Sequence, residues 1–174
     1  GIVHPFSCAA WIASIHRGVD VARAMGLTHI AGCTGSTSED AVRAHFNLPL
    51  EAMMDMGDFA GGLLKYVREH PVARITIGGG IGKITKLAQG AMDLHSGRSQ
   101  IDFEWLARFA PESLHGEVKA ANTAQQVLDM LGGNLAQHVA REAKFQIDKT
   151  LRGAPMAANV MIVDRAGKII AHAE

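Results

Sequence analysis

Hydrophobic positions along the chain alternate between helical and extended patterns. Residues 8–25 place apolar side chains mostly three or four positions apart, as in a helix with one buried face, and Ser7 stands where an N-cap is expected. Three short runs have the pattern of strands: residues 28–32, 51–56 and 73–77. A helical pattern follows each of these strands: residues 36–46, 59–70 and 81–92. Three strand–loop–helix units in succession predict a parallel sheet with helices on both faces.

The expected starts of two helices carry capping signals. Ser36 and Glu39 have the spacing of a capping box, and Asp58 stands where it can cap the helix over residues 59–70. After Asp93 the pattern changes to short polar stretches and three further helices, at residues 103–109, 123–131 and 135–151. The last segments, residues 159–164 and 168–172, read as two strands around a tight return. The sequence therefore predicts one Rossmann-like, three-layer α/β/α domain over residues 1–174, with a mainly parallel sheet and a C-terminal hairpin.

Composition narrows the classes of partner and setting. A chain of 174 residues can bury one substantial core. Lys plus Arg and Asp plus Glu number 17 each, so net charge favours neither nucleic acid nor an anionic membrane as a partner. Two cysteines and the lack of an apolar run of about 20 residues favour a reduced, cytoplasmic, soluble protein. Because Gly1 stands first and residues 1–5 read as the end of a strand that enters a turn, we expect a fragment of a longer protein. Homo-oligomerisation stays open.

The expected loops after the strands have the chemistry of a ligand site. Ligands of open parallel sheets bind beyond the carboxyl ends of the strands, so the loops at residues 33–38, 57–58 and 78–83 are expected to converge. The helices that follow favour anionic groups at their N-termini. Five glycines in these loops allow backbone N–H groups to approach a ligand closely: Gly35, Gly78, Gly79, Gly80 and Gly82. The alternative is that these glycines only permit tight turns.

The spacing of the glycines and of the candidate metal ligands does not match three familiar motifs. A P-loop would need glycine at position 77 and Ser or Thr at position 84, and both are isoleucine. A dinucleotide fingerprint begins at Gly78 and Gly80 but has Lys83 in place of the third glycine, so a nicotinamide dehydrogenase is disfavoured. His4 and Cys8 are four residues apart but lack a second ligand pair, so we expect no metal. His4 and His95 are the two histidines whose positions could face the cleft.

Six segments, in order along most of the chain, resemble the cobalt-precorrin-5B C(1)-methyltransferases of anaerobic cobalamin biosynthesis. They are Gly-Ile-Val-His-Pro-Phe-Ser at 1–7, Thr-Gly-Ser-Thr-Ser-Glu at 34–39, Gly-Asp-Phe-Ala-Gly at 57–61, the run 80–90 around Gly-Lys at 82–83, His-Ser at 95–96 and Ala-Asn-Thr-Ala at 121–124. The resemblance implies transfer of a methyl group from S-adenosylmethionine to ring carbon 1 of a cobalt-containing tetrapyrrole. It also implies that an additional N-terminal domain is missing here, so that the chain is the C-terminal part of a longer protein.

The resemblance and the chemistry of the ligands together give candidate site residues. The cofactor candidates are Thr34, Gly35, Ser36, Thr37, Glu39, Asp58, Gly78, Gly79, Gly80 and Gly82. The candidates for the polycarboxylate substrate are His4, Ser7, Lys83 and Ser96. His95 and Asp93 are the candidate catalytic groups, as a general base that removes a substrate proton. The alternative hypothesis is a non-catalytic module that binds a tetrapyrrole or a nucleotide, and a structural partner protein is a third.

Overall fold

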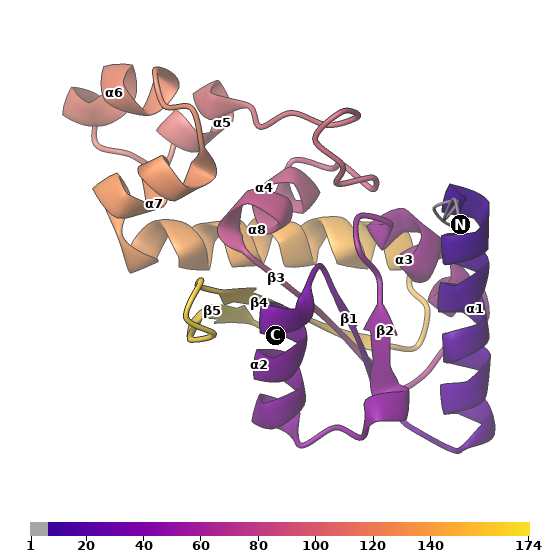
Figure 1. Cartoon of the computed structure of the whole chain (residues 1–174). Helices are drawn as coiled ribbons and strands as arrows, with labels where there is room; N and C mark the ends of the chain where they lie inside the picture. Colours follow the sequence, from indigo (N-terminus) through magenta and orange to yellow (C-terminus); the bar gives the residue numbers. More distant parts are fainter. Residues whose placement is uncertain (1–6) are drawn as a thin grey trace, which may run out of the picture.

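The computed structural model describes residues 7–174 and contains a five-stranded sheet in the order β2-β1-β3-β4-β5 (Figure 1). Its strands are β1 His29–Cys33, β2 Met53–Asp55, β3 Arg74–Gly79, β4 Ala157–Val163 and β5 Ile169–Ala173. Neighbours among β1 to β4 are parallel, and β5 pairs antiparallel with β4. The mainly parallel sheet and the C-terminal hairpin are thus confirmed, as is the parallel pairing of the first three predicted strands.

Within residues 7–174, seven helices follow the predicted order with shifted boundaries, and α6 was not predicted. The helices are α1 Cys8–Ala24, α2 Ser36–Phe46, α3 Ala60–Glu69, α4 Ile81–Ala88, α5 Phe103–Ala107, α6 His115–Lys119, α7 Ala124–Leu131 and α8 Gly133–Leu151. The expected extension of the fourth helix to residue 92 is wrong, because Gly90 adopts a φ of 92° two residues after α4 ends. The strand expected from residue 51 begins at Met53, since Leu50–Ala52 forms a 3₁₀ turn, η1. A second such turn, η2, spans Glu112–Leu114.

Two of the three predicted caps are wrong. Ser7 caps α1 as expected, and its Oγ accepts a hydrogen bond from Ala10 N at 3.1 Å. The Ser36–Glu39 capping box does not form, because Ser36 is already helical and Gly35 is the N-cap, with no side-chain hydrogen bond. Asp58 does not cap α3 either, since Phe59 occupies the N-cap position. Compared with the predicted caps, α2 therefore begins one residue earlier and α3 one residue later.

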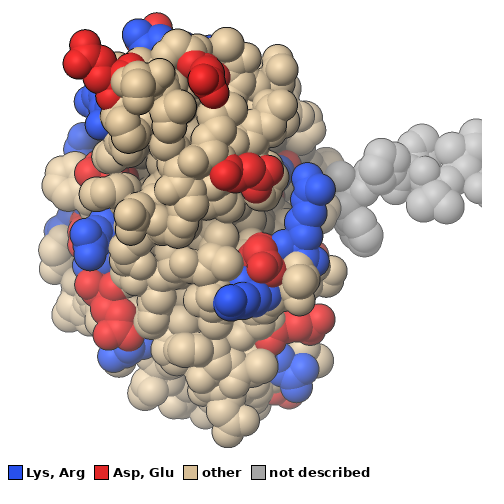
Figure 2. Space-filling view, turned by 90° about the vertical axis from the view of Figure 1, so that its left-hand side faces the viewer, with Lys and Arg blue, Asp and Glu red and all other residues tan. Residues whose placement is uncertain are grey.

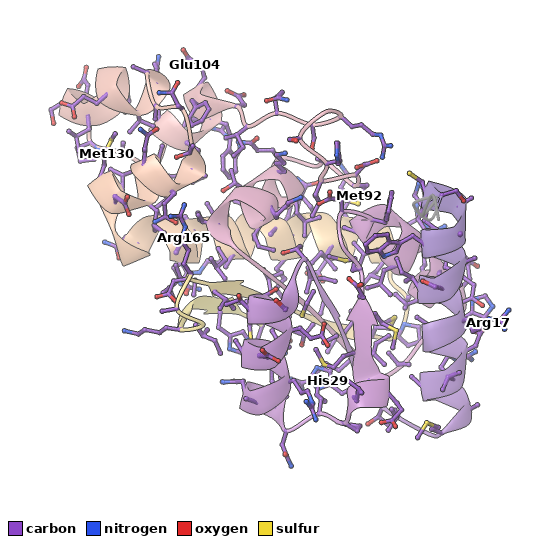
Figure 3. All side chains as sticks on the ribbon, viewed as in Figure 1. Arg17, His29, Met92, Glu104, Met130 and Arg165 are labelled. Atoms are coloured by element: carbon purple, nitrogen blue, oxygen red, sulfur yellow. The ribbon has the colours of Figure 1, made fainter. Side chains whose placement is uncertain are left out.

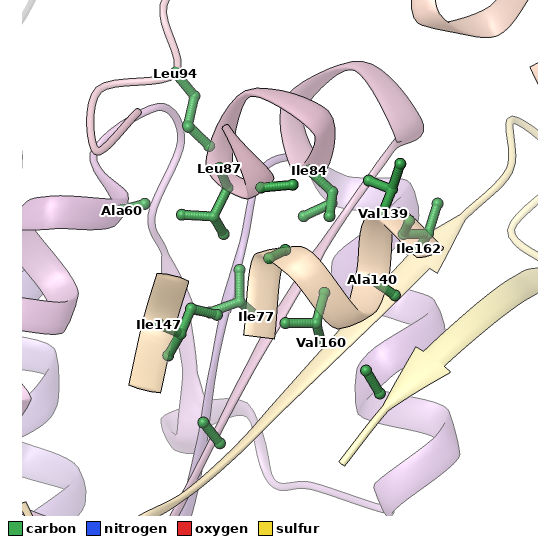
Figure 4. Close-up of a cluster of buried hydrophobic side chains, with 14 of the residues drawn as sticks. Ala60, Ile77, Ile84, Leu87, Leu94, Val139, Ala140, Ile147, Val160 and Ile162 are labelled. Atoms are coloured by element: carbon green, nitrogen blue, oxygen red, sulfur yellow. The ribbon is translucent and has the colours of Figure 1, made fainter. Parts of the chain in front are cut away.

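Successive strand residues contribute to two apolar clusters. Ile30 belongs to the larger cluster, whereas Ala31 belongs to a smaller one that contains Val42 of α2. Since adjacent residues of a strand point to opposite faces, the two clusters lie on opposite sides of the sheet. Figure 4 shows part of the larger cluster, where side chains of α4 and α8 surround Ile77 of β3 and Val160 of β4. This packing fixes α4 beside the end of β3.

The short helices α5 and α6 and the start of α7 lie between α4 and α8 in the chain and project beyond the sheet (Figure 1). Charges of both signs are interspersed over the face in Figure 2, with a broad uncharged area between them. Within residues 7–174, no helix combines the length and the apolar character needed to cross a bilayer.

Candidate ligand-binding cleft

A cleft of about 560 Å³ lies beyond the carboxyl ends of β1, β3 and β4. Its walls come from segments far apart in sequence: Thr34 to Ser38, Gly80 to Gly82, Asn122 to Gln125 and Val163 to Arg165, with Ile101, Leu128 and Ile170. A volume of this size suits a small organic ligand. β1 has β2 on one side and β3 on the other, so the cleft lies at the point where the strand order reverses, which is where doubly wound sheets bind their ligands.

Three helices begin at this cleft, and two of them have free N-termini. The N-caps of α2 and α4 are Gly35 and Gly80, and neither helix has a side-chain cap. By contrast α7 is closed by a capping box, in which Thr123 Oγ1 accepts from Gln126 N at 3.2 Å and Gln126 Oε1 accepts from Thr123 N at 3.1 Å. The first N–H groups of α2 and α4 are therefore available to an anionic ligand group.

The glycines of the cleft loops divide into two kinds. A Cβ at Gly78 would lie 2.7 Å from Val42 Cγ2, and one at Gly79 would lie 2.7 Å from Thr34 Oγ1. These two glycines are required by close packing within the fold. A Cβ at Gly35 or Gly82 would meet nothing within 4 Å, and both residues line the cleft. Packing thus explains the first pair, whereas the second pair leaves backbone open toward the cleft.

The structure brings together six of the ten cofactor candidates. The six that line the cleft are Thr34, Gly35, Ser36, Thr37, Gly80 and Gly82. Gly78 and Gly79 lie behind this wall in β3, and Glu39 is close enough to the buried Cys33 thiol to help raise its pKa to about 12, after the larger effect of burial. Asp58 does not line the cleft. The expectation that the loop at residues 57–58 joins the other two is therefore wrong.

Asp58 is turned away from the cleft because its carboxylate pairs with Lys83 of α4. Gly82 lines the cleft, whereas the side chain of Lys83 reaches the loop before α3. Successive helical residues are about 100° apart, so the first turn of α4 separates the cleft from this ion pair. Lys83, a substrate candidate, thus belongs to a second polar region.

The second region, called the ionic cluster below, contains Asp58, Lys83, Asp93 and Arg98. The two ion pairs lie near each other, because the charges of Lys83, Asp58 and Asp93 all influence the pKa of Lys86, which burial lowers most. Arg98 Nη1 lies 2.6 Å from Asp93 Oδ2, and the backbone N–H of His95 donates to Asp93 Oδ1 at 3.1 Å. Partial burial favours the neutral acid, but the hydrogen bonds from Arg98 and His95 outweigh it and hold the pKa of Asp93 below its usual value. An ionised carboxylate of low pKa is a weak general base.

The remaining candidates lie outside the cleft or are engaged elsewhere. His95 and Ser96 are exposed and do not line the cleft, and His95 Nδ1 accepts from Gly97 N at 3.0 Å. Ser7 is committed to the α1 cap. His4 lies outside the described residues. The structure thus places the catalytic candidates on the far side of α4 from the cleft, and their roles stay predictions.

The part of the cleft that follows β4 was not predicted from the sequence. Among the described residues that line the cleft, Arg165 alone has a cationic side chain, and Figure 3 shows it extending from the β4–β5 turn toward α7. Asp164 shapes this turn, since its Oδ1 accepts from Ala166 N and Lys168 N, each at 2.9 Å. The available signal was the apolar run at 160–163. Read as a strand parallel to β3, it would have placed the residues after it at the same edge.

Fold and cleft define the chain as an α/β domain with an open cleft at the carboxyl ends of its parallel strands. Comparison with known proteins shows what the chain is similar to. Residues 93–174 match the family model described as CbiD, C-terminal domain. The chain is 55% identical, over 179 aligned residues, to proteins named cobalt-precorrin-5B C(1)-methyltransferase from Brucella anthropi, Brucella canis and Brucella abortus. Over nearly its whole length, the chain is therefore similar to the C-terminal half of proteins named cobalt-precorrin-5B C(1)-methyltransferase.

The similarity extends over one half of the relatives. Each match covers 98% of this chain and 49% of the relative, so the chain spans about half the length of the curated relatives it matches. The matched part is their C-terminal half. No solved structure gives a significant match to the chain.

Proposed function

We propose that the full-length protein transfers a methyl group from S-adenosylmethionine to ring carbon 1 of cobalt-precorrin-5B in cobalamin biosynthesis, and that this chain supplies the donor-binding cleft. The names of the relatives support the reaction. The observation that carries the assignment of the cleft is the pair of uncapped helix N-termini, α2 and α4, that open into it.

The cleft-lining residues fit the chemical parts of S-adenosylmethionine. The amino-acid carboxylate would be held by the N–H groups at the starts of α2 and α4. The Thr34 hydroxyl and the Asn122 amide would suit the ribose hydroxyls. An apolar wall for the adenine is provided by Ile81, Ile101, Leu128 and Ile170. When bound, the cofactor supplies a methyl group on a sulfonium, which needs no nucleophilic residue of the protein. The contribution of this chain is to orient the donor, and positioning lowers barriers by up to roughly 7–11 kcal/mol.

Fewer residues of this chain are candidates for substrate contacts or for the general base than the sequence alone suggested. Lys83 is neutralised by Asp58 and Arg98 by Asp93. Arg165, at the cleft, is the better candidate for a tetrapyrrole carboxylate, because no described side chain forms an ion pair with it. None of the histidines within residues 7–174 lines the cleft. These positions support a division of labour in which the N-terminal half contributes part of the substrate site.

The proposal also includes a three-layer fold, a single domain and a cytoplasmic setting. The two clusters on opposite sides of the sheet support a Rossmann-like, three-layer arrangement. The sheet takes β1, β2 and β3 from before residue 93 and β4 and β5 from after it, which supports one domain rather than two. Both cysteines are free, Cys8 exposed and Cys33 buried, as suits the reducing cytoplasm.

Isothermal titration of S-adenosylhomocysteine tests the proposal, with the full-length protein and with a full-length Gly82→Val variant. We expect the wild type to bind and the variant to bind markedly more weakly, because the added side chain stands on the cleft wall. Equal affinities would place the donor site elsewhere. Binding of the tetrapyrrole without any binding of S-adenosylhomocysteine would favour the alternative, a non-catalytic module. The observation that favours this alternative is that His95, a candidate general base, lies outside the cleft.

A further inference from the structure

The first half of α1 presents an uncharged surface to solvent. No Asp, Glu, Lys or Arg occurs from Cys8 to His16, whereas the second half of the helix carries Arg17, Asp20 and Arg23. Six of these uncharged residues are exposed and form what is called the α1 face below: Cys8, Ala9, Ala10, Trp11, Ala13 and Ser14. A helix surface that faces water normally carries charged side chains. This part of α1 has the composition of a covered surface.

A rigid aromatic residue lies within the α1 face. Trp11 is 37% exposed, its indole Nε1 donates to the carbonyl oxygen of Asp55 at 2.9 Å, and its ring centroid lies 6.1 Å from that of Phe59. A Cβ at Gly57 would lie 3.1 Å from the indole ring, so the ring rests against the loop after β2. A hollow of about 350 Å³ beside it is lined by Ala10, Trp11, Ser14 and Asp55. Preorganised, partly exposed tryptophans beside a hollow are typical anchors of protein interfaces.

The curated relatives indicate what covers this surface. They extend over about twice the length of this chain and match it only in their C-terminal half. The match covers 98% of the chain, so their N-terminal half precedes a segment that corresponds to the region of α1. In Figure 1, α1 stands at the β2 edge of the molecule with its first turn beside the irregular segment after α4, and in Figure 3 Arg17 points away from the body.

We propose that the α1 face is the docking surface for the N-terminal half of the same polypeptide, and that the contact is apolar and uncharged. Arg98 Nη2 lies 3.6 Å from Cys8 Sγ, so the N-terminal half bound to this face lies beside the ionic cluster. Docking here buries Trp11 and encloses the side of α4 that carries Lys83. The inference goes beyond the proposed reaction and does not rest on it, because it concerns how the two halves pack.

Thiol labelling of the full-length protein tests the proposal without measuring methyl transfer. Three probes are compared by peptide mass spectrometry after exposure to a maleimide: the native Cys8, an Ala13→Cys variant and, as the matched control on the same helix, Val21→Cys. Val21 is 46% exposed and lies outside the α1 face. We expect residues 8 and 13 to react about ten-fold more slowly than residue 21, a ratio equivalent to about 1.4 kcal/mol. Labelling of all three at equal rates would overturn the proposal.

A second pair of variants and a dilution series separate the N-terminal half from other occupants. Ala13→Arg places a charge in the contact and is expected to restore rapid labelling of Cys8 and to speed proteolytic cleavage between the halves, whereas Val21→Arg changes neither. If protection of Cys8 disappears on dilution, in step with dissociation of a dimer by analytical ultracentrifugation, a second copy covers the face and the proposal is wrong. Wild-type behaviour of Ala13→Arg in both measurements also contradicts it.

Discussion

Lys83, in the first turn of α4, pairs with Asp58 in the loop between β2 and α3, although the residue before it, Gly82, lines the cleft. The side chains are 37% and 22% exposed, so the pair is partly shielded from water. This relationship ties the start of α4 to the start of α3. It gives both residues a structural role, and the ligand contacts expected of them stay predictions.

Removal of either partner is expected to lower stability without affecting the cleft. Lys83→Ala or Asp58→Ala should each reduce the free energy of unfolding by about 0.5–1 kcal/mol, and the double variant by less than the sum of the two. Urea unfolding of the four proteins measures the coupling. S-adenosylhomocysteine affinity in the full-length protein should stay within a few-fold. If Lys83→Ala lowered the affinity without lowering the stability, Lys83 would be a ligand contact after all.

Two neighbouring glycines are expected to respond oppositely to alanine. In Gly79→Ala the new methyl group would lie 2.7 Å from Thr34 Oγ1 and 3.1 Å from Ile84 Cδ1, so we expect a loss of about 1–3 kcal/mol. Gly82→Ala meets no atom within 4 Å and replaces a helical glycine, which should leave stability unchanged or raise it by up to about 1 kcal/mol. Thermal unfolding checks both, and a destabilised Gly82→Ala would contradict the assignment of Gly82 to an open wall.

The parallel pairing of the first three strands and the shared edge were predictable because they follow from the hydrophobic period and the strand–loop–helix connections. The patterns at residues 28–32, 51–56 and 73–77 gave three parallel strands, and the rule for carboxyl ends then brought Thr34 and Gly82 to one cleft. Side-chain direction was not predictable. The spacing of Ser36 and Glu39 allows a capping box only if the helix begins at residue 37, and the spacing itself does not show whether the helix begins there or at Ser36.

Contacts between distant segments account for the other errors. Asp58 was assigned to a ligand because no sequence signal shows that Lys83, 25 residues away, reaches its carboxylate. Asn122 and Arg165 join the cleft through the packing of α7 on α4 and the pairing of β4 with β3. Such long-range packing is set by the whole core rather than by local periodicity.

Acid is expected to destabilise the fold partly through His29. Burial, and then the charge of Arg74, lower the pKa of His29 from 6.5 to about 4, and its Nε2 lies 2.8 Å from Thr76 Oγ1. The unfolded chain therefore takes up this proton first, so the stability that neutral His29 contributes is complete above pH 6.5 and is lost as the pH falls toward about 4. Denaturant unfolding at several pH values should show that the free energy of unfolding depends less steeply on pH in His29→Gln than in the wild type. The same pH dependence in both proteins would contradict this role of His29.

The start of α2 offers the sharpest test of how the cleft holds an anionic group. Gly35 is the N-cap, its φ of 176° is extended backbone that any residue adopts, and a Cβ there meets nothing within 4 Å. Gly35→Asn would place a side-chain acceptor over the free N–H groups, Gly35→Asp would add a negative charge, and Gly35→Ala serves as the control for size alone. Both capping variants should keep or slightly raise stability, since these residues are good N-caps.

If α2 binds the carboxylate of the donor, S-adenosylhomocysteine affinity in the full-length protein should fall in the order Ala, Asn, Asp. The loss for Asp should be about ten-fold or more, because hydrogen bonds to charged groups are worth about 1.5–3 kcal/mol. Equal affinities in all three variants would move the carboxylate to the other open helix start, α4.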